Sequence, residues 1–251
     1  MNTDLALHDF IAATELGAFP GFYPSFKGAE MESVSGEIEQ SFLNAKSLVS
    51  FASGINGQNK QDVLDSTLFA QLAANKKFPG DDQIISWYTY FIEVMNKIGW
   101  VIEGAEFSRF NSSHALFEIE NVIIDILTSA LGGNYVTIIS KTLGALKELG
   151  SKDGKIKAFE KNTHSLKKGA FQIGLATEEN GLAALTLGTF LISTNTEIKT
   201  ILFFKSSQDS VDMQYCSRKG TLNPSVYDKI RETISAKIIE QSNIYVTEIE
   251  I

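Results

Sequence analysis

The chain has 251 residues, of which 43% are hydrophobic and 21% are charged, and these are values of an ordinary globular protein. Its formal net charge is -8. An acidic chain is a poor partner for nucleic acid, because binding to phosphates requires a basic surface. The charge also disfavours generic attraction to anionic headgroups, but it leaves apolar contact with zwitterionic lipid open.

The single cysteine, Cys216, excludes an intrachain disulfide and any zinc site with two Cys ligands. The first residues include Asp4 and Asp9 without a basic segment, so we expect no signal peptide. The sequence contains no run of eighteen apolar residues, so it predicts no membrane-spanning helix. We therefore expect a protein that is soluble and cytoplasmic as synthesised, or is released outside the cell by a route that the sequence does not show.

We expect a single domain over 1–251, with a mainly helical part over 1–99. The polar segment 54–62 is expected to be a loop rather than a domain boundary. Asp81 or Asp82 can cap the helix that follows them. Apolar residues at helical spacing predict helices over 36–51, 61–76 and 83–98.

The part over 100–251 is expected to begin with a strand at 100–110 and to continue with two apolar helices, 118–131 and 135–149, separated by Gly132 and Gly133. An antiparallel meander joined by short polar turns should follow, and then a helix over 224–240 capped by Asn223 and a last strand. Period-two patterns place the strands of the meander at 156–161, 170–177, 182–193, 198–206 and 211–218.

The strand at 182–193 is apolar on both faces, with Leu185 and Leu187 on one face and Phe190 and Ile192 on the other. The segment 198–206 has the same pattern. Antiparallel strands with one wet face alternate between apolar and polar residues, so these strands need cover on both sides. We therefore predict an α+β fold with three layers, in which helices cover both faces of an antiparallel sheet. The strand at 211–218 does alternate and should lie nearer the sheet edge.

Catalytic motifs are missing from the sequence. His8, His114 and His164 have no metal-ligand spacing, and no phosphate-binding loop or nucleophile elbow is present. Helix capping explains Asp81-Asp82 better than a catalytic carboxylate pair does. We expect no enzyme activity, no metal and no cofactor. Cys216 has three possible roles, as a buried packing residue, a nucleophile or an acylation site.

The apolar hairpins over 170–193 and 198–218 allow two interpretations. One is the two-sided core of an ordinary soluble protein. The other is a set of strands that enter a bilayer after their helical cover has moved away, since strands of about nine to eleven residues can cross the hydrocarbon core.

The order of elements over about 100–220 resembles that of the cytolytic delta-endotoxins, the Cyt toxins, and their fungal volvatoxin-type relatives. The closest local match is a run with two Phe, a Ser/Gln/Asp turn and an alternating strand. The segments that carry the resemblance are WVIEGAEFSRF, NVIIDILTSALGGNYVTIISKTLGAL, KAFEKNTHS, FQIGLATEENGLAALTLGTFLIS and EIKTILFFKSSQDSVDMQYCSRKGTLN.

The resemblance implies a toxin-like virulence protein that is soluble when made, binds or perforates lipid bilayers, and forms pores as a homo-oligomer. Its inserting elements would be Phe171–Thr177, Leu182–Ser193, Ile198–Lys205 and Val211–Cys216. The membrane-insertion candidates in them are Phe171, Ile173, Leu185, Leu187, Phe190, Ile192, Ile201, Leu202, Phe203, Phe204 and Met213.

Two other hypotheses remain. A shared fold does not require shared activity, so the chain is alternatively a non-catalytic interaction or structural module without lytic activity, which would use the loop at 18–26 or an edge strand. A virulence factor modified at Cys216 by a thioester or a lipid is the third hypothesis.

Overall fold

The computed structural model describes residues 3–21, 38–104, 106–111, 116–131, 133–207, 210–241 and 245–251. The predictions for Gly132, for His114 and for the part of the aromatic loop at 22–26 lie outside these ranges, as do residues 36 and 37 of the first predicted helix.

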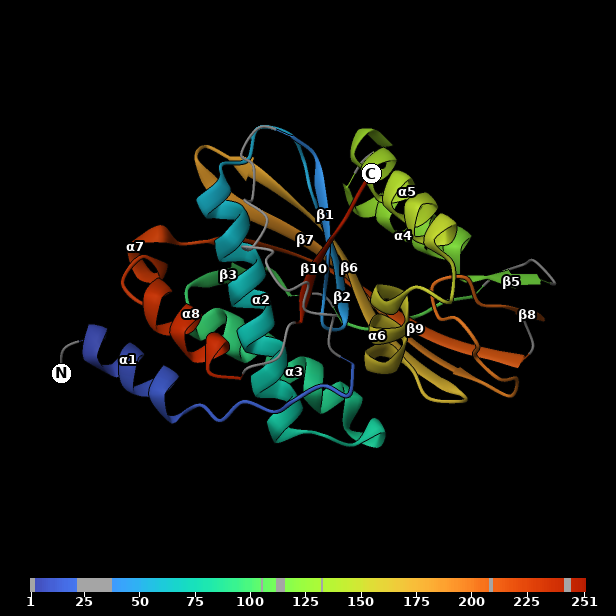
Figure 1. The fold of residues 1–251 in the computed structure, drawn as a ribbon, viewed down its shortest axis with the longest axis horizontal. Helices are drawn as coiled ribbons and strands as arrows, with labels where there is room; N and C mark the ends of the chain where they lie inside the picture. Colours follow the sequence, from blue (N-terminus) through green and yellow to red (C-terminus); the bar gives the residue numbers. More distant parts are fainter. Residues whose placement is uncertain are drawn as a thin grey trace.

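A central sheet of eight strands forms the middle layer of the described structure (Figure 1). Its strands are β1 (Gln40–Asn44), β2 (Ser47–Phe51), β3 (Trp100–Ile102), β4 (Ser108–Arg109), β6 (Lys168–Glu179), β7 (Leu182–Thr194), β9 (Val211–Leu222) and β10 (Val246–Ile249). The order across the sheet is β10-β1-β2-β6-β7-β9-β3, with β4 also paired to β9. Two short strands, β5 (Leu116–Glu118) and β8 (Lys205–Ser207), form a separate pair.

Helices cover both faces of this sheet, which confirms the α+β class and the predicted layering (Figure 1). One group is α1 (Thr3–Ala13), α2 (Gly57–Lys77), α3 (Ile84–Lys97), α7 (Pro224–Tyr227) and α8 (Arg231–Ile239), with the short 3-10 turn η1 (Asp81–Gln83) before α3. The other group is α4 (Ile119–Leu131), α5 (Gly133–Leu149) and α6 (Gly154–Thr163).

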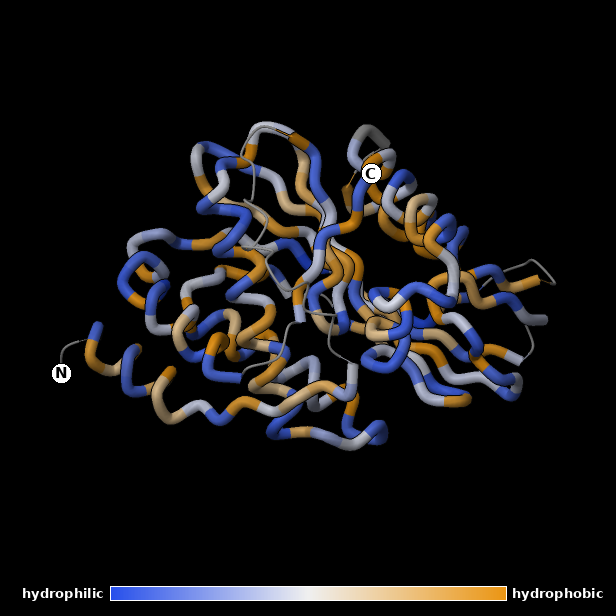
Figure 2. The backbone as a smooth tube through the Cα atoms, in the orientation of Figure 1, coloured by the Kyte–Doolittle hydropathy of each residue, from blue (hydrophilic) through white to orange (hydrophobic). Residues whose placement is uncertain are grey.

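Each face of the sheet has its own hydrophobic core, and apolar residues follow the strands through the centre of the molecule (Figure 2). The α2–α3 side contains Leu185 and Leu187, whereas the α4–α6 side contains Phe190 and Ile192. Strand β7 therefore has apolar residues on both faces, as predicted. Successive strand residues point to opposite faces, so each strand contributes to both cores.

The hairpin β6–β7 turns at Asn180 and Gly181, which have positive φ values of 53° and 78°. These are the residues that a tight two-residue hairpin turn favours. Strand β9 pairs antiparallel with β7 from Ala184↔Thr221 to Thr194↔Val211, and only the short β3 and β4 lie beyond it. Its place near the sheet edge confirms the prediction from its alternating pattern.

The predicted helix at 36–51 is wrong where the structure describes it, because this segment is the hairpin β1–β2. Phe42 and Val49 enter one core while Leu43 and Leu48 enter the other. Apolar residues on both faces of two short strands imitate helical spacing. The turn is made by Ala45 at a φ of 51°, without the glycine that normally signals it.

Two predicted strands of the meander are also wrong. The segment 156–161 lies in helix α6, whose first backbone N–H groups are capped by Asp153 Oδ1, which accepts from Lys155 N at 2.7 Å and Ile156 N at 3.3 Å. The segment 198–204 is a loop that precedes β8. The antiparallel meander therefore consists of β6, β7 and β9, and the loop at 198–204 between β7 and β9 is bonded to α6 through Ile201 and Glu160.

The strand predicted over 100–110 is instead two short strands, β3 and β4, and Asp81 and Asp82 lie within η1 rather than capping α3. Three further differences are smaller. The polar segment 54–62 becomes helical from Gly57, because Asn56 caps α2 by accepting from Asn59 N at 2.8 Å. The helix expected over 224–240 is divided into α7 and α8, with Asn223 as the predicted cap. The sheet is antiparallel except between β2 and β6, which run parallel from Ser47↔Gln172 to Phe51↔Ala176.

Candidate functional site

The three long strands β6, β7 and β9, called here the ribbon, have 12, 13 and 12 residues. One face of the ribbon, called here the apolar face, lies under α4 and α5. The rings of Phe171 and Phe190 stack there with centroids 5.2 Å apart. Five of the sequence-predicted insertion candidates share this face and are buried: Phe171, Ile173, Phe190, Ile192 and Met213.

The opposite face of the ribbon is more polar. Leu185 and Leu187 lie there, in the core shared with α2 and α3. Strand alternation places Gln172 and Thr189 on this face too, and the Gln172 side-chain N–H donates to Thr189 Oγ1 at 3.4 Å. The structure therefore divides the predicted candidates between an apolar face and a mixed face.

The remaining candidates, Ile201, Leu202, Phe203 and Phe204, belong to the loop after β7 rather than to a strand. Three of them are buried in the α4–α6 core, while Phe203 is partly exposed. The loop is held by the backbone N–H of Ile201, which donates to Glu160 Oε2 of α6 at 2.9 Å.

Helices α4 and α5, called here the lid, contact the sheet mainly through apolar side chains. Gly188 leaves room for Leu127, since a Cβ at this glycine would lie 2.9 Å from Leu127 Cδ2. The buried polar contact between the lid and the sheet involves three hydroxyl groups. Thr142 Oγ1 of α5 lies 2.7 Å from Ser41 Oγ and 3.3 Å from Ser50 Oγ.

Helix α2 on the other face is attached by a series of buried hydrogen bonds. Asn44 Nδ2 donates to the Leu64 carbonyl at 3.0 Å and to Thr67 Oγ1 at 2.9 Å. Gln71 accepts from Lys46 N at 2.9 Å and donates to the Asn44 carbonyl at 3.0 Å. These bonds hold the β1–β2 turn against α2.

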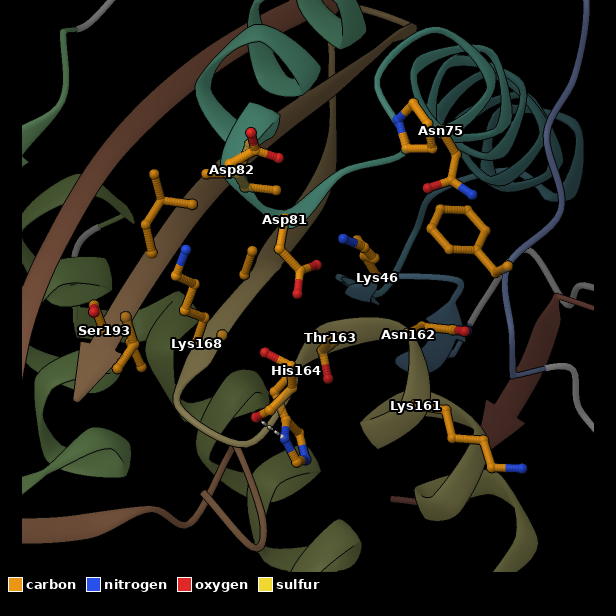
Figure 3. A pocket seen from close by; sticks show the side chains of 18 of the residues that line it. Lys46, Asn75, Asp81, Asp82, Lys161, Asn162, Thr163, His164, Lys168 and Ser193 are labelled. Carbon is orange, nitrogen blue, oxygen red and sulfur yellow. Dashed lines mark hydrogen bonds between the residues drawn. The ribbon is translucent and has the colours of Figure 1, made fainter. Parts of the chain in front are cut away.

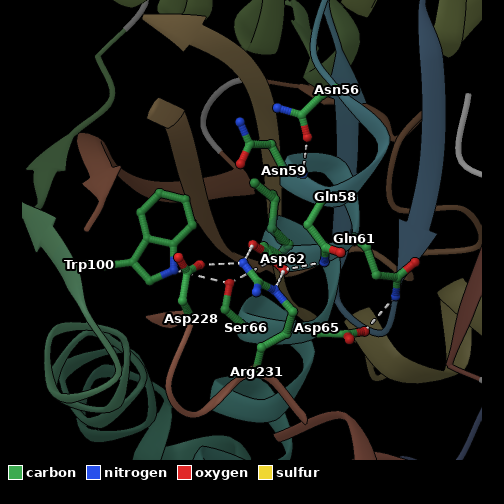
Figure 4. Close-up of polar contacts among 11 residues, drawn as sticks. Asn56, Gln58, Asn59, Gln61, Asp62, Asp65, Ser66, Trp100, Asp228 and Arg231 are labelled. Carbon is green, nitrogen blue, oxygen red and sulfur yellow. Dashed lines mark hydrogen bonds and ion pairs between the residues drawn. The ribbon is translucent and has the colours of Figure 1, made fainter. Parts of the chain in front are cut away.

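A charged cluster joins α2 to α7 and α8 (Figure 4). Arg231 donates two hydrogen bonds to Asp62, at 2.7 and 2.8 Å, and a third to Asp228 at 2.5 Å. The Asp62 side chain is only 3% exposed, so the carboxylate of this ion pair is buried. Burial raises the pKa of the neighbouring Asp65 to about 6, although a hydrogen bond from Gln61 opposes this shift.

A pocket of about 590 Å³ lies where the β1–β2 turn, the start of α3, the end of α6 and one end of the ribbon meet (Figure 3). Its charged lining includes Lys46, Asp81, Asp82 and Lys168, and its apolar lining includes Phe19, Ile84, Leu191 and Ile192. Sequence analysis missed this pocket, because its walls come from segments far apart in the chain and no motif marks them.

Lys46 is the group in this pocket whose chemistry is most altered. Its Nζ lies 5.4 Å from the centroid of the Trp87 ring and 6.0 Å from that of Phe19. Burial lowers the pKa of Lys46 to about 8, while the negative charge of Asp81 opposes this shift.

His164 lines the same pocket and lies 2.6 Å from Glu160 through its Nε2. Burial disfavours the charged ring, but hydrogen bonds to Glu160 and to the Ser165 carbonyl outweigh burial and raise the pKa of His164. Glu160 also accepts from the backbone N–H of Ile201, so the pair lies beside the loop at Ile201.

Cys216 is a free thiol that is 3% exposed, on β9 opposite Thr189. Within the described ranges, no three His, Cys, Asp or Glu side chains are grouped to hold a metal ion. None of the helices described here combines the length and the apolar character that crossing a bilayer requires.

No protein-family model and no curated protein matches this chain. Among solved structures, the Evf virulence factor is similar, with 14% identity, a TM-score of 0.40, and coverage of 96% of this chain and 88% of that one. A delta-endotoxin shares 14% identity and a TM-score of 0.40 over 82% of this chain and 92% of that one. Activated Cyt2Ba from Bacillus thuringiensis subsp. israelensis shares 13% identity and a TM-score of 0.33, over 54% and 79%. Identities this low leave the activity of this chain to be argued from its own residues.

Proposed function

We propose that this protein is a toxin-like, membrane-active protein that binds lipid bilayers and inserts the ribbon into them after the lid has moved off the apolar face. The observation that carries the proposal is the asymmetry of the ribbon. Its apolar face is continuous over Phe171, Phe190 and Met213, whereas its other face contains Gln172 and Thr189. An inserted strand needs one face for lipid and one for a polar interior.

The length of the strands supports the same proposal. Strands of 12 and 13 residues exceed the roughly 9–11 residues that a tilted strand needs to cross the hydrocarbon core. A three-stranded ribbon in lipid would leave unpaired N–H and C=O groups along both edges, at a cost of several kcal/mol for each group. Several copies must therefore pair their ribbons, so insertion requires oligomerisation.

The attachment of the lid supports its release. Apolar contacts between the lid and the ribbon can be exchanged for apolar contacts with lipid, because both environments lack water. The polar groups under α2 have no such replacement and would cost free energy if exposed unpaired. The lid is therefore the cover that a bilayer can displace.

A reversible crosslink tests this directly. In the double variant S41C/T142C, made in a Cys216→Ser background, a disulfide would replace the 2.7 Å contact between the two hydroxyls and join α5 to β1. We expect the oxidised protein to release no dye from phosphatidylcholine vesicles, and release to return on reduction. The matched control is S41C/S50C, which joins β1 to β2 at a contact of 2.8 Å and leaves the lid free.

Two results would contradict the proposal. One is unchanged release by the oxidised S41C/T142C protein. The other is an unmodified protein that neither binds nor permeabilises vesicles of zwitterionic or mixed anionic composition, with or without proteolytic trimming. That second result would favour the non-lytic interaction module, and native mass measurements with candidate protein partners would then follow.

A further inference from the structure

We propose that the pocket beside the β1–β2 turn is a covalent binding site for a small carbonyl compound, an aldehyde or ketone, with the Lys46 amine as the nucleophile. This inference is independent of membrane activity. It rests on the position of the amine, on the apolar walls around it and on the carboxylate that faces it (Figure 3).

The amine is held in position by its backbone. Lys46 N donates to Gln71 Oε1 at 2.9 Å, and the Lys46 carbonyl accepts from Gln172 N at 3.0 Å. The turn is therefore fixed to both α2 and β6. A lysine whose backbone is fixed loses less conformational entropy on reaction than one on a mobile loop.

The surroundings keep part of the amine uncharged. The rings of Phe19 and Trp87 lie near Lys46 Nζ, with centroids at 6.0 and 5.4 Å. Because burial lowers the pKa of Lys46 to about 8, the neutral fraction at pH 7 is about 300-fold larger than for an exposed lysine. Desolvation of this kind activates lysine for attack on a carbonyl carbon.

The ligand class follows from the chemistry of the walls. A volume of about 590 Å³ lies in the range of pockets that bind small molecules. Phe19, Ile84 and Leu191 offer apolar contacts, and Lys168 adds a cationic group at the rim. A carbonyl compound with a compact apolar or aromatic body fits this set.

The reaction is a condensation. The Lys46 Nζ lone pair attacks the carbonyl carbon, and the C=O π electrons move to oxygen, which takes up the proton that nitrogen loses. The resulting carbinolamine then loses its hydroxyl group together with the second nitrogen proton as water, and a C=N bond forms. No electron is gained or lost overall. Water in the pocket can relay these protons, while the Asp81 carboxylate, which faces Lys46 in Figure 3, acts through its negative charge, which raises the pKa of Lys46.

The test uses 2-hydroxybenzaldehyde as the probe, with sodium cyanoborohydride to trap the imine and peptide mass spectrometry to locate it. We expect Lys46 in the folded full-length protein to be labelled at pH 7 at least about tenfold faster than the exposed Lys152 and Lys199. Labelling of Lys46 no faster than of these two lysines would overturn the inference.

Three variants sharpen the result. Lys46→Met keeps the apolar stem and should abolish the fast phase, whereas Lys168→Met at the pocket rim should retain it. Asp81→Asn removes the charge that raises the pKa of Lys46, so labelling at pH 7 should become severalfold faster. An unchanged rate in Asp81→Asn, with circular dichroism showing a folded protein, would contradict the assignment even if Lys46→Met failed to fold.

Discussion

The helices on the two faces of the sheet are attached to it in different ways. Helix α2 forms buried hydrogen bonds to the β1–β2 hairpin through Asn44 and Gln71, and an ion pair between Asp62 and Arg231 extends this network to α8. The lid on the other face relies on apolar packing and on the hydroxyl contact of Thr142. Hydrogen bonds and charges fix geometry, whereas apolar packing is non-directional and tolerates exchange with lipid. In the proposed mechanism, α2 therefore stays on the sheet and the lid is the cover that moves.

The largest effect should come from breaking the charged cluster. Arg231→Ala leaves the buried Asp62 with only the amide of Gln58 as a described partner, at 2.9 Å. We expect a loss of about 3–5 kcal/mol in the free energy of unfolding. Lys141→Ala, which removes an exposed ion pair to Glu39 beside the lid, should cost less than about 1 kcal/mol. Urea denaturation measures both, and equal losses would contradict the comparison.

The pH dependence of stability should also come from the α2 side. The pKa of Asp65 is raised on folding, from 3.8 to about 6, because the folded protein favours the protonated carboxyl group. The folding stability that this group contributes is therefore fully present below pH 3.8 and is lost as pH rises through 6. Asp65→Asn should therefore stabilise the protein at pH 8, by at most about 3 kcal/mol, and change little near pH 4. Melting temperatures of both proteins from pH 4 to 8 provide the measurement. A stabilisation by Asp65→Asn that does not vary with pH would show that the raised pKa of Asp65 is not its cause.

Overpacking should loosen the lid. Gly188→Val places methyl groups against Leu127 and Phe190 and should destabilise the fold by about 1–3 kcal/mol. Gly144 in α5 has no atom within 4 Å of an added Cβ, so Gly144→Ala should stabilise by about 0.5–1 kcal/mol. Denaturant midpoints distinguish the two. Faster vesicle permeabilisation is expected for Gly188→Val alone.

The smallest effect concerns one hydroxyl. Thr142→Val removes the contact to Ser41 and Ser50, which remain bonded to each other at 2.8 Å, so we expect a cost of about 1 kcal/mol. Thr67→Val makes a similar change on α2. Only Thr142→Val should raise the rate of dye release, since only that hydroxyl joins the lid to the sheet. Equal rates for the two variants would show that the lid is not the moving cover.

The sequence predicted the parts of the fold that local patterns determine. The two-sided strand with Leu185 and Phe190 on opposite faces, the helix pair before it and the polar turn at Asn180-Gly181 are all present. The β1–β2 hairpin was missed because its turn uses Ala45, and the loop at 198–204 was mistaken for a strand because its run of apolar residues imitates a strand covered on both faces.

The candidate site was only partly predictable. Strand alternation places Phe171, Ile173 and Met213 correctly on a buried face, but which face is the more apolar depends on the register between strands. The Lys46 pocket gave no local signal at all. Its lysine lies 35 residues before Asp81 and 118 before His164, and only the folded chain brings these groups together.

The parallel pairing of β2 with β6 has a consequence for how this molecule can divide. It is the parallel ladder among those described, and it joins two segments that are distant along the chain, β2 of the first hairpin and β6 of the second. It spans five residue pairs, from Ser47↔Gln172 to Phe51↔Ala176. The sheet can divide along this ladder without opening the β1–β2 or the β6–β7 hairpin, and hydrogen exchange of the backbone amides in the ladder would report whether the two parts separate.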